Sequence, residues 1–146
     1  MRNAIWVVVG AALAVGAWWV WRPGGTVATV ADWLRHDGCE VKVESVHLPM
    51  PRDFAAPERR FTDAAKEAKF VECEGLGGAI FYYRFASVGD RLRAAAANPR
   101  FYRSSTSCAK GTEALYDNLI FSQTRTAAYC RRLRFQIERP LPRWQH

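Results

Sequence analysis

Apolar positions along this chain of 146 residues form one long continuous run near its start and shorter periodic groups behind it. Residues 4–21 include no charged side chain. As a helix with a ~1.5 Å rise per residue, this run would measure roughly 27 Å, close to the ~30 Å hydrocarbon core of a bilayer. Trp6 near one end and Trp21 at the other match the aromatic belts of membrane interfaces. We therefore predict a single transmembrane helix over residues 4–21, with residues 1–3 in the cytoplasm.

A signal peptide that is removed, leaving a secreted domain, is the alternative for this run. Arg2 supplies a positive charge before it, and Val15-Gly16-Ala17 offers a cleavage site of small residues. Cleavage there would leave the apolar residues 18–21 as a new terminus, whereas signal peptides usually become polar before the cut. A buried helix of a soluble protein would need a larger core than this chain easily provides. We favour an uncleaved signal anchor.

Behind a short linker at residues 22–26, the pattern predicts one domain over residues 27–146. Apolar residues between Val27 and Leu34 recur at helical spacing, and Gly38 follows as a stop signal. Residues 39–46 alternate between apolar and charged positions, which is typical of a half-buried strand. Further strands are expected at 70–74, 79–85, 113–121 (where a helix is the alternative) and 135–138. Further helices are expected at 62–69 (where an extension of the next strand is the alternative), 87–97 and from Thr126 to Leu133, with Ser87 and Thr126 as N-caps.

The order of these elements predicts an α+β fold, a mostly antiparallel sheet with helices on one face. Aromatic residues 81, 82, 83 and 85 would then lie on alternate faces of one strand. Since they cannot all be buried on one side, Tyr82 is expected at the surface.

Four cysteines indicate the compartment. Cys39, Cys73, Cys108 and Cys130 are an even set without a C-x-x-C pair or a zinc-like spacing to histidine. We therefore predict two disulfides in an oxidising compartment, although four reduced thiols in a cytosol-facing domain are the alternative. Of the three connectivities, we favour Cys39–Cys73 and Cys108–Cys130, because each joins neighbouring elements. Charges flanking the apolar run are nearly balanced, so the cysteines decide the orientation, with an extracytoplasmic, periplasmic domain.

Candidate catalytic chemistry is sparse in this sequence. The three histidines, His36, His47 and His146, are far apart along the chain, and no nucleophile, phosphate-binding or metal-binding motif accompanies them. We expect no catalytic, cofactor-binding or metal-ligating residues and no cofactor. An enzyme is the alternative, and it would have to gather distant residues such as His47, Asp53, Glu72 and Tyr83 into one pocket.

The net charge of +7 lies almost entirely in the last third of the chain, where residues 100–146 include nine basic and three acidic side chains. The densest basic residues are Arg131, Arg132, Arg134, Arg139 and Arg143. They form a candidate anion-facing patch for lipid headgroups, a charged wall polymer or an acidic protein face. A solvated helix face with a basic tail is the alternative. Nucleic acid is not expected, because no binding motif is present.

These features together predict a single-pass protein of a bacterial cell membrane, held in the bilayer through residues 4–21. Its outer domain is expected to bind or scaffold a partner without catalysis, as an accessory subunit of a membrane assembly or alone. A short anchor before a disulfide-bearing α+β domain is similar to the architecture of many small bacterial envelope proteins. That resemblance is of architecture only and implies no particular activity.

Liposome binding tests the arginine patch. The domain of residues 27–146 should bind anionic liposomes more tightly than neutral ones, with each arginine near the surface contributing up to ~1 kcal/mol. Added salt should weaken this binding, because it shortens the Debye length. Replacing Arg131 and Arg134 together with glutamine should reduce it in a co-sedimentation assay. Unchanged binding by that variant would show that the arginines only solvate a helix face.

Overall fold

The computed structural model describes residues 25–74, 78–102, 107–117 and 123–138. In chain order the elements are α2 (Gly25–His36), β1 (Glu40–Ser45), α3 (Ala56–Asp63), β2 (Glu67–Glu74), β3 (Gly78–Arg84), α4 (Val88–Ala97), α5 (Pro99–Tyr102), β4 (Ser107–Lys110), β5 (Glu113–Asp117), α6 (Gln123–Arg132) and β6 (Gln136–Glu138). The predicted transmembrane helix over residues 4–21 lies outside the described residues. None of the described helices is long and apolar enough to cross a membrane.

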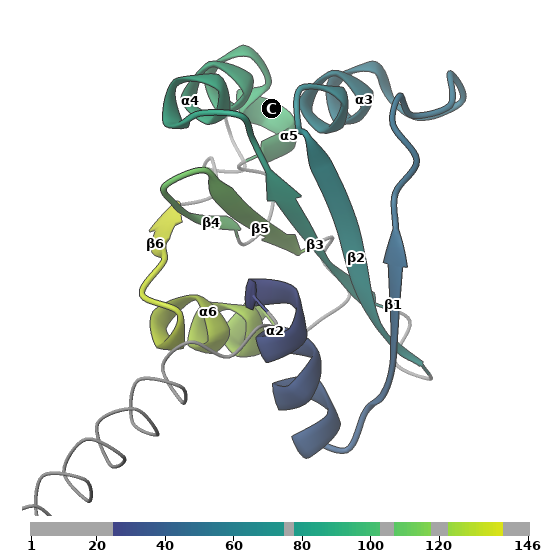
Figure 1. Ribbon diagram of the computed structural model, residues 1–146, viewed down its shortest axis with the longest axis vertical. Helices are drawn as coiled ribbons and strands as arrows, with labels where there is room; N and C mark the ends of the chain where they lie inside the picture. Colours follow the sequence, from purple (N-terminus) through teal and green to yellow (C-terminus); the bar gives the residue numbers. More distant parts are fainter. Residues whose placement is uncertain (1–24, 75–77, 103–106, 118–122, 139–146) are drawn as a thin grey trace, which may run out of the picture.

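The six described strands form a sheet in the order β1-β2-β3-β5-β4-β6 (Figure 1). Every pairing between them is antiparallel. The α+β class and the antiparallel sheet predicted from the sequence are therefore confirmed. β2 and β3 form the central hairpin, whose register runs from the Glu67–Arg84 pair to the Cys73–Gly78 pair. β1 lies at one edge of the sheet and the short β6 at the other.

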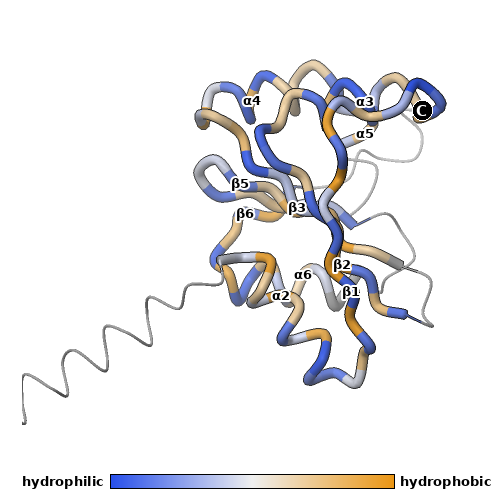
Figure 2. The backbone as a smooth tube through the Cα atoms, turned by 45° about the vertical axis from the view of Figure 1, so that its right-hand side comes forward, coloured by the Kyte–Doolittle hydropathy of each residue, from blue (hydrophilic) through white to orange (hydrophobic). Residues whose placement is uncertain are grey.

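Helices cover both faces of this sheet, so the prediction that they lie on one face is wrong. α2 and α6 pack on what we call the first face, and α3, α4 and α5 pack on the second face (Figures 1 and 2). The physical reason lies in β3, which is apolar on both sides. Ile80 and Tyr82 belong to the core under α2 and α6, whereas Phe81 and Tyr83 belong to the core under α3 to α5. A strand that is apolar on both sides needs cover on both sides.

Tyr82 is therefore buried, with 6% of its surface exposed, and the prediction that it lies at the surface is wrong. Its hydroxyl donates a hydrogen bond of 2.7 Å to Oε1 of Glu113, which also accepts one of 2.9 Å from Oγ1 of Thr26. Burial, and after it the Glu113 carboxylate, raises the pKa of the Tyr82 phenol above its ordinary value. Because Glu113 of β5 accepts both hydrogen bonds, it links the first turn of α2 to β3 and β5.

Phe61 of α3 organises the core on the second face. It is fully buried, and its ring centroid lies 5.1 Å from that of Tyr83, 5.6 Å from Phe85 and 4.9 Å from Tyr102. Offset and edge-to-face aromatic contacts of this kind add to the free energy of burying the rings. They hold α3 and α5 against the sheet.

The two helices of the first face end in the same backbone motif. After α2, the Cys39 amide donates to the Leu34 carbonyl and the Gly38 amide to that of Arg35, with Gly38 at a φ of 89°. After α6, the equivalent bonds run from Phe135 to Cys130 and from Arg134 to Arg131, with Arg134 at a φ of 58°. Both patterns are Schellman motifs, which satisfy the last carbonyls of a helix and turn the chain sharply.

Two disulfides lie beside these helix ends. Cys39 is bonded to Cys73 of β2, and Cys108 of β4 to Cys130 of α6, which is the pairing favoured from the sequence. The predicted disulfide bonding is thus confirmed. The bonds join residues 34 and 22 positions apart. On the chain-entropy estimate each contributes roughly 3–4 kcal/mol to the free energy of unfolding.

Two element boundaries differ from the prediction. Residues 62–69 are not one helix: α3 ends at Asp63 and β2 begins at Glu67. Pro57 in the first turn starts α3 earlier than expected, because its missing amide has no partner there in any case. Extension of the strand, the alternative considered, is what occurs after Glu67.

The predicted N-cap at Ser87 is confirmed, since its hydroxyl accepts the Asp90 amide at 3.0 Å.

The strand expected to begin at residue 113 is β5, whereas its hairpin partner β4 was not predicted. The turn between them passes through Gly111, whose φ of 57° suits glycine. Thr126 is not an N-cap, because α6 begins at Gln123. Its buried hydroxyl donates instead to Oδ2 of Asp117 at 2.7 Å, which ties α6 to the end of β5.

Replacing Arg134 with glycine should raise the free energy of unfolding by up to about 1 kcal/mol. The left-handed conformation at this position is disfavoured for any residue with a Cβ, and the greater freedom of glycine in the unfolded chain offsets only part of that gain. Urea denaturation with both disulfides intact measures the change. The matched control, Arg131→Gly inside α6, should lower the same quantity by about 1 kcal/mol. Destabilisation by both variants would contradict the argument.

Candidate functional site

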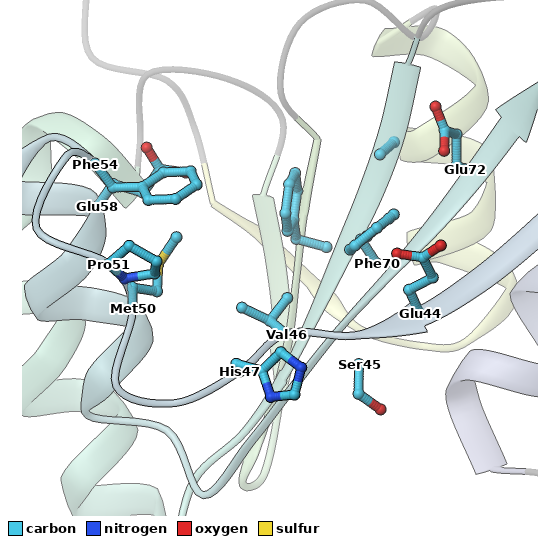
Figure 3. A pocket seen from close by; sticks show the side chains of 12 residues that line it. Glu44, Ser45, Val46, His47, Met50, Pro51, Phe54, Glu58, Phe70 and Glu72 are labelled. Atoms are coloured by element: carbon cyan, nitrogen blue, oxygen red, sulfur yellow. The ribbon is translucent and has the colours of Figure 1, made fainter.

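An open groove of about 540 Å³ lies on the second face, between the loop that follows β1 and the halves of β2 and β3 that are far from α3 (Figure 3). Apolar side chains from β2, from β3 and from the loop line most of it: Val46, Met50, Pro51, Phe54, Phe70, Ala79 and Phe81. Polar side chains complete the lining: Glu44, Ser45, His47, Glu58 and Glu72. The groove is therefore an apolar surface with a rim of carboxylates.

Two aromatic residues on neighbouring strands form the floor of the groove. Phe70 of β2 and Phe81 of β3 are register partners, and their ring centroids are 6.1 Å apart. Phe81 also contacts Tyr116 of β5, at 6.0 Å between centroids. Both phenylalanines are only half-buried. The floor thus continues the second-face core out to a surface that the described helices leave open.

The loop between β1 and α3 forms the opposite side of the groove and is held by specific hydrogen bonds. The Met50 amide donates to Oδ1 of Asp63 at 2.7 Å, and the Val46 amide donates to the Ala68 carbonyl at 2.8 Å. Met50 is buried, whereas 42% of the Phe54 surface is exposed. A large apolar side chain held in this way offers a partner a preformed contact.

The strands that carry the groove place four carboxylates on the second face. These carboxylates belong to Glu40 and Glu44 of β1 and to Glu72 and Glu74 of β2. Glu40 pairs with Glu74 and Lys42 with Glu72, and strand alternation puts Glu44 on the same side of the sheet. A hydrogen bond from Lys42 to Glu44, and then the charges of the neighbouring glutamates, raise the pKa of the Lys42 ammonium. One ammonium against four carboxylates leaves this area net negative on a chain whose total charge is +7. It suits a cationic partner.

Glu58 contributes a fifth carboxyl group from the first turn of α3. Burial raises its pKa above the ordinary value, because removal from water disfavours the charged form. A cation placed in the groove would favour the ionised carboxylate. Glu58 is therefore the side chain whose protonation a cationic ligand would alter most directly.

The structure brings together two of the four residues named for an enzyme pocket. His47 and Glu72 both line the groove, but Asp53 does not, and Tyr83 is buried in the second-face core, where its hydroxyl oxygen accepts from Thr62 at 3.4 Å. His36 is exposed at the end of α2. Among the described residues, no three side chains of histidine, cysteine, aspartate or glutamate converge as metal ligands would.

The arginine patch lies at the end of α6, on the first face, and so on the opposite side of the sheet from the groove. Arg131, Arg132 and Arg134 are exposed, while Arg139 and Arg143 lie outside the described residues. The Arg132 guanidinium sits over the ring of Trp33, 5.5 Å from its centroid, a cation–π contact. Anion binding by this patch stays a prediction.

The sequence contains one signal for the groove, in the alternation of residues along β2. Phe70, Glu72 and Glu74 share one parity along β2, so an aromatic residue and two carboxylates necessarily lie on one face. Met50 and Phe54 are apolar residues inside a loop rich in proline. Their apposition to β2 depends on how the loop folds back, which no local pattern expresses.

Comparisons of the chain with protein-family models, with curated proteins and with solved structures give no match. The geometry of the groove and the charges around it are therefore the basis for a functional proposal.

Replacing Glu58 with glutamine tests its electrostatic environment. A carboxyl whose folded pKa is raised contributes stability that is fully present below the unfolded pKa and is lost as pH rises through the folded pKa. The variant, which does not ionise, should therefore gain stability relative to the parent as pH rises above about 4.3, the ordinary pKa of a glutamate in an unfolded chain. Thermal unfolding across this range measures the difference. A difference that stays constant with pH would contradict the proposed environment.

Proposed function

We propose that this chain is a single-pass envelope protein whose domain binds a partner through the groove and catalyses no reaction. The observation that carries the proposal is the groove itself, an aromatic floor with an exposed phenylalanine opposite it and carboxylates around it. Exposed apolar surfaces of this kind mark interaction sites. A binding or scaffolding role is favoured over an enzyme, since the groove gathers only His47 and Glu72 of the residues proposed for catalysis.

The two disulfides support a location outside the cytoplasm, since such bonds persist in oxidising compartments. In this proposal residues 4–21 anchor the protein in the bilayer. Only residues 22–24 separate that run from α2, and three residues span at most about 10 Å. The domain would then sit close to the membrane.

This arrangement suggests how the domain would face the bilayer. α2 and the arginines of α6 share the first face, so in the proposal that face is directed towards the anionic headgroups. The groove lies on the second face and would remain accessible to another protein of the envelope. An accessory subunit of a membrane assembly would use the two faces in this way.

In-cell photo-crosslinking tests the proposal. A photoreactive phenylalanine derivative at Phe54 should give one discrete adduct in intact cells, because this side chain borders the groove and is 42% exposed. The matched control is the same derivative at Leu92 of α4, which is 53% exposed but does not line the groove. We expect no adduct there. Equal labelling at the two positions, or none at position 54, would contradict a groove-based partner.

A further inference from the structure

β1 is an edge strand, with its free side beside the groove. It pairs with β2 from Glu40 to Ser45, and no described strand pairs with its other side (Figure 1). An edge strand presents unpaired amide and carbonyl groups to which a strand of another chain can add. β6, at the other edge, is only three residues long and offers much less backbone.

The two faces of β1 differ in chemistry. Glu40, Lys42 and Glu44 point to the second face, and Val41 and Val43 to the first. Val43 is 41% exposed, which is unusual for a valine next to a core. A strand added beside β1 would therefore meet carboxylates on one face and an exposed apolar side chain on the other.

We propose that β1 and the groove bind an extended, cationic segment of a partner polypeptide, in which basic and apolar residues alternate. The segment adds to the free edge of β1. Its basic side chains lie on the second face against Glu44 and Glu72, with their aliphatic stems over Phe70. Its apolar side chains lie on the first face beside Val43. This inference rests on the proposed function and names the chemistry of the partner.

Charge selects this occupant over a second copy of the chain. Each β1 strand presents two carboxylates and one ammonium on its second face, so two copies paired edge to edge would bring two net negative surfaces together. A cationic strand would instead place basic side chains opposite these carboxylates, and opposite charges across a strand pair stabilise it. Main-chain hydrogen bonds would supply most of the affinity, because exposed ion pairs contribute little each. The carboxylates would supply the preference for a basic sequence.

Peptide binding to the full chain in uncharged detergent micelles tests the inference. The probe is a labelled ten-residue peptide of alternating lysine and valine, compared with peptides in which glutamate or serine replaces lysine. Fluorescence anisotropy should show tighter binding of the lysine peptide than of the serine or the glutamate peptide. Replacing Glu44 and Glu72 together with glutamine should weaken it about tenfold, the size expected for two exposed pairs. The matched control is Glu67→Gln on the first face of β2, which should leave the affinity unchanged.

Amide hydrogen exchange with the same peptide distinguishes strand addition from simple contact. Protection should increase in β1 and stay constant in β6. Binding of the lysine peptide without protection of β1, or undiminished binding by the Glu44→Gln/Glu72→Gln variant, would overturn the inference. Equal binding of the serine or glutamate peptide would overturn the cationic preference while supporting a groove that binds segments. Binding of no peptide would overturn this inference but not the proposed function, because crosslinking at position 54 tests the proposed function separately.

Discussion

The structure depends on a sheet whose central strands are apolar on both faces. In β3, Ile80 and Tyr82 lie on one side and Phe81 and Tyr83 on the other, and three of the four are almost completely enclosed. Neither face can be left in water without a large loss of hydrophobic free energy. Helices from separate parts of the chain therefore cover the first face (α2 and α6) and the second (α3, α4 and α5). The groove exists because the second set leaves Phe70 of β2 and Phe81 of β3 only half-buried.

Covalent and backbone constraints act mainly on the first face. Both disulfides lie in the core under α2 and α6, and each sits next to a Schellman motif that turns the chain out of a helix. A disulfide restrains the unfolded chain, whereas the helix end sets where the cysteine lies in the folded one. The second face has aromatic packing around Phe61 instead, with no described cross-link. The described part of the face that carries the groove is thus held by side-chain packing and hydrogen bonds rather than by a disulfide.

The end of α6 and the surface around the groove differ in local charge. Exposed arginines lie at the end of α6 on the first face, and a net negative area surrounds the groove on the second. The net charge of +7 therefore describes neither surface, because local potentials decay within about 10 Å at moderate salt. A membrane protein with this distribution would meet anionic lipid and a cationic partner on different sides. The sequence pattern of β2, in which Phe70, Glu72 and Glu74 share one parity, already contained half of that site.

Local periodicity and residue chemistry were enough to predict the α+β class, the capped helix after Ser87, the strands on either side of residues 75–77 and the disulfides. Tertiary contacts place helices on both faces of the sheet, bury Tyr82 against Glu113 and pair Thr126 with Asp117 instead of a helix end. Burial and partners of this kind arise between residues far apart in the chain. The apposition of Phe54 to the floor of the groove is of the same kind, since it depends on a loop folded back over a sheet.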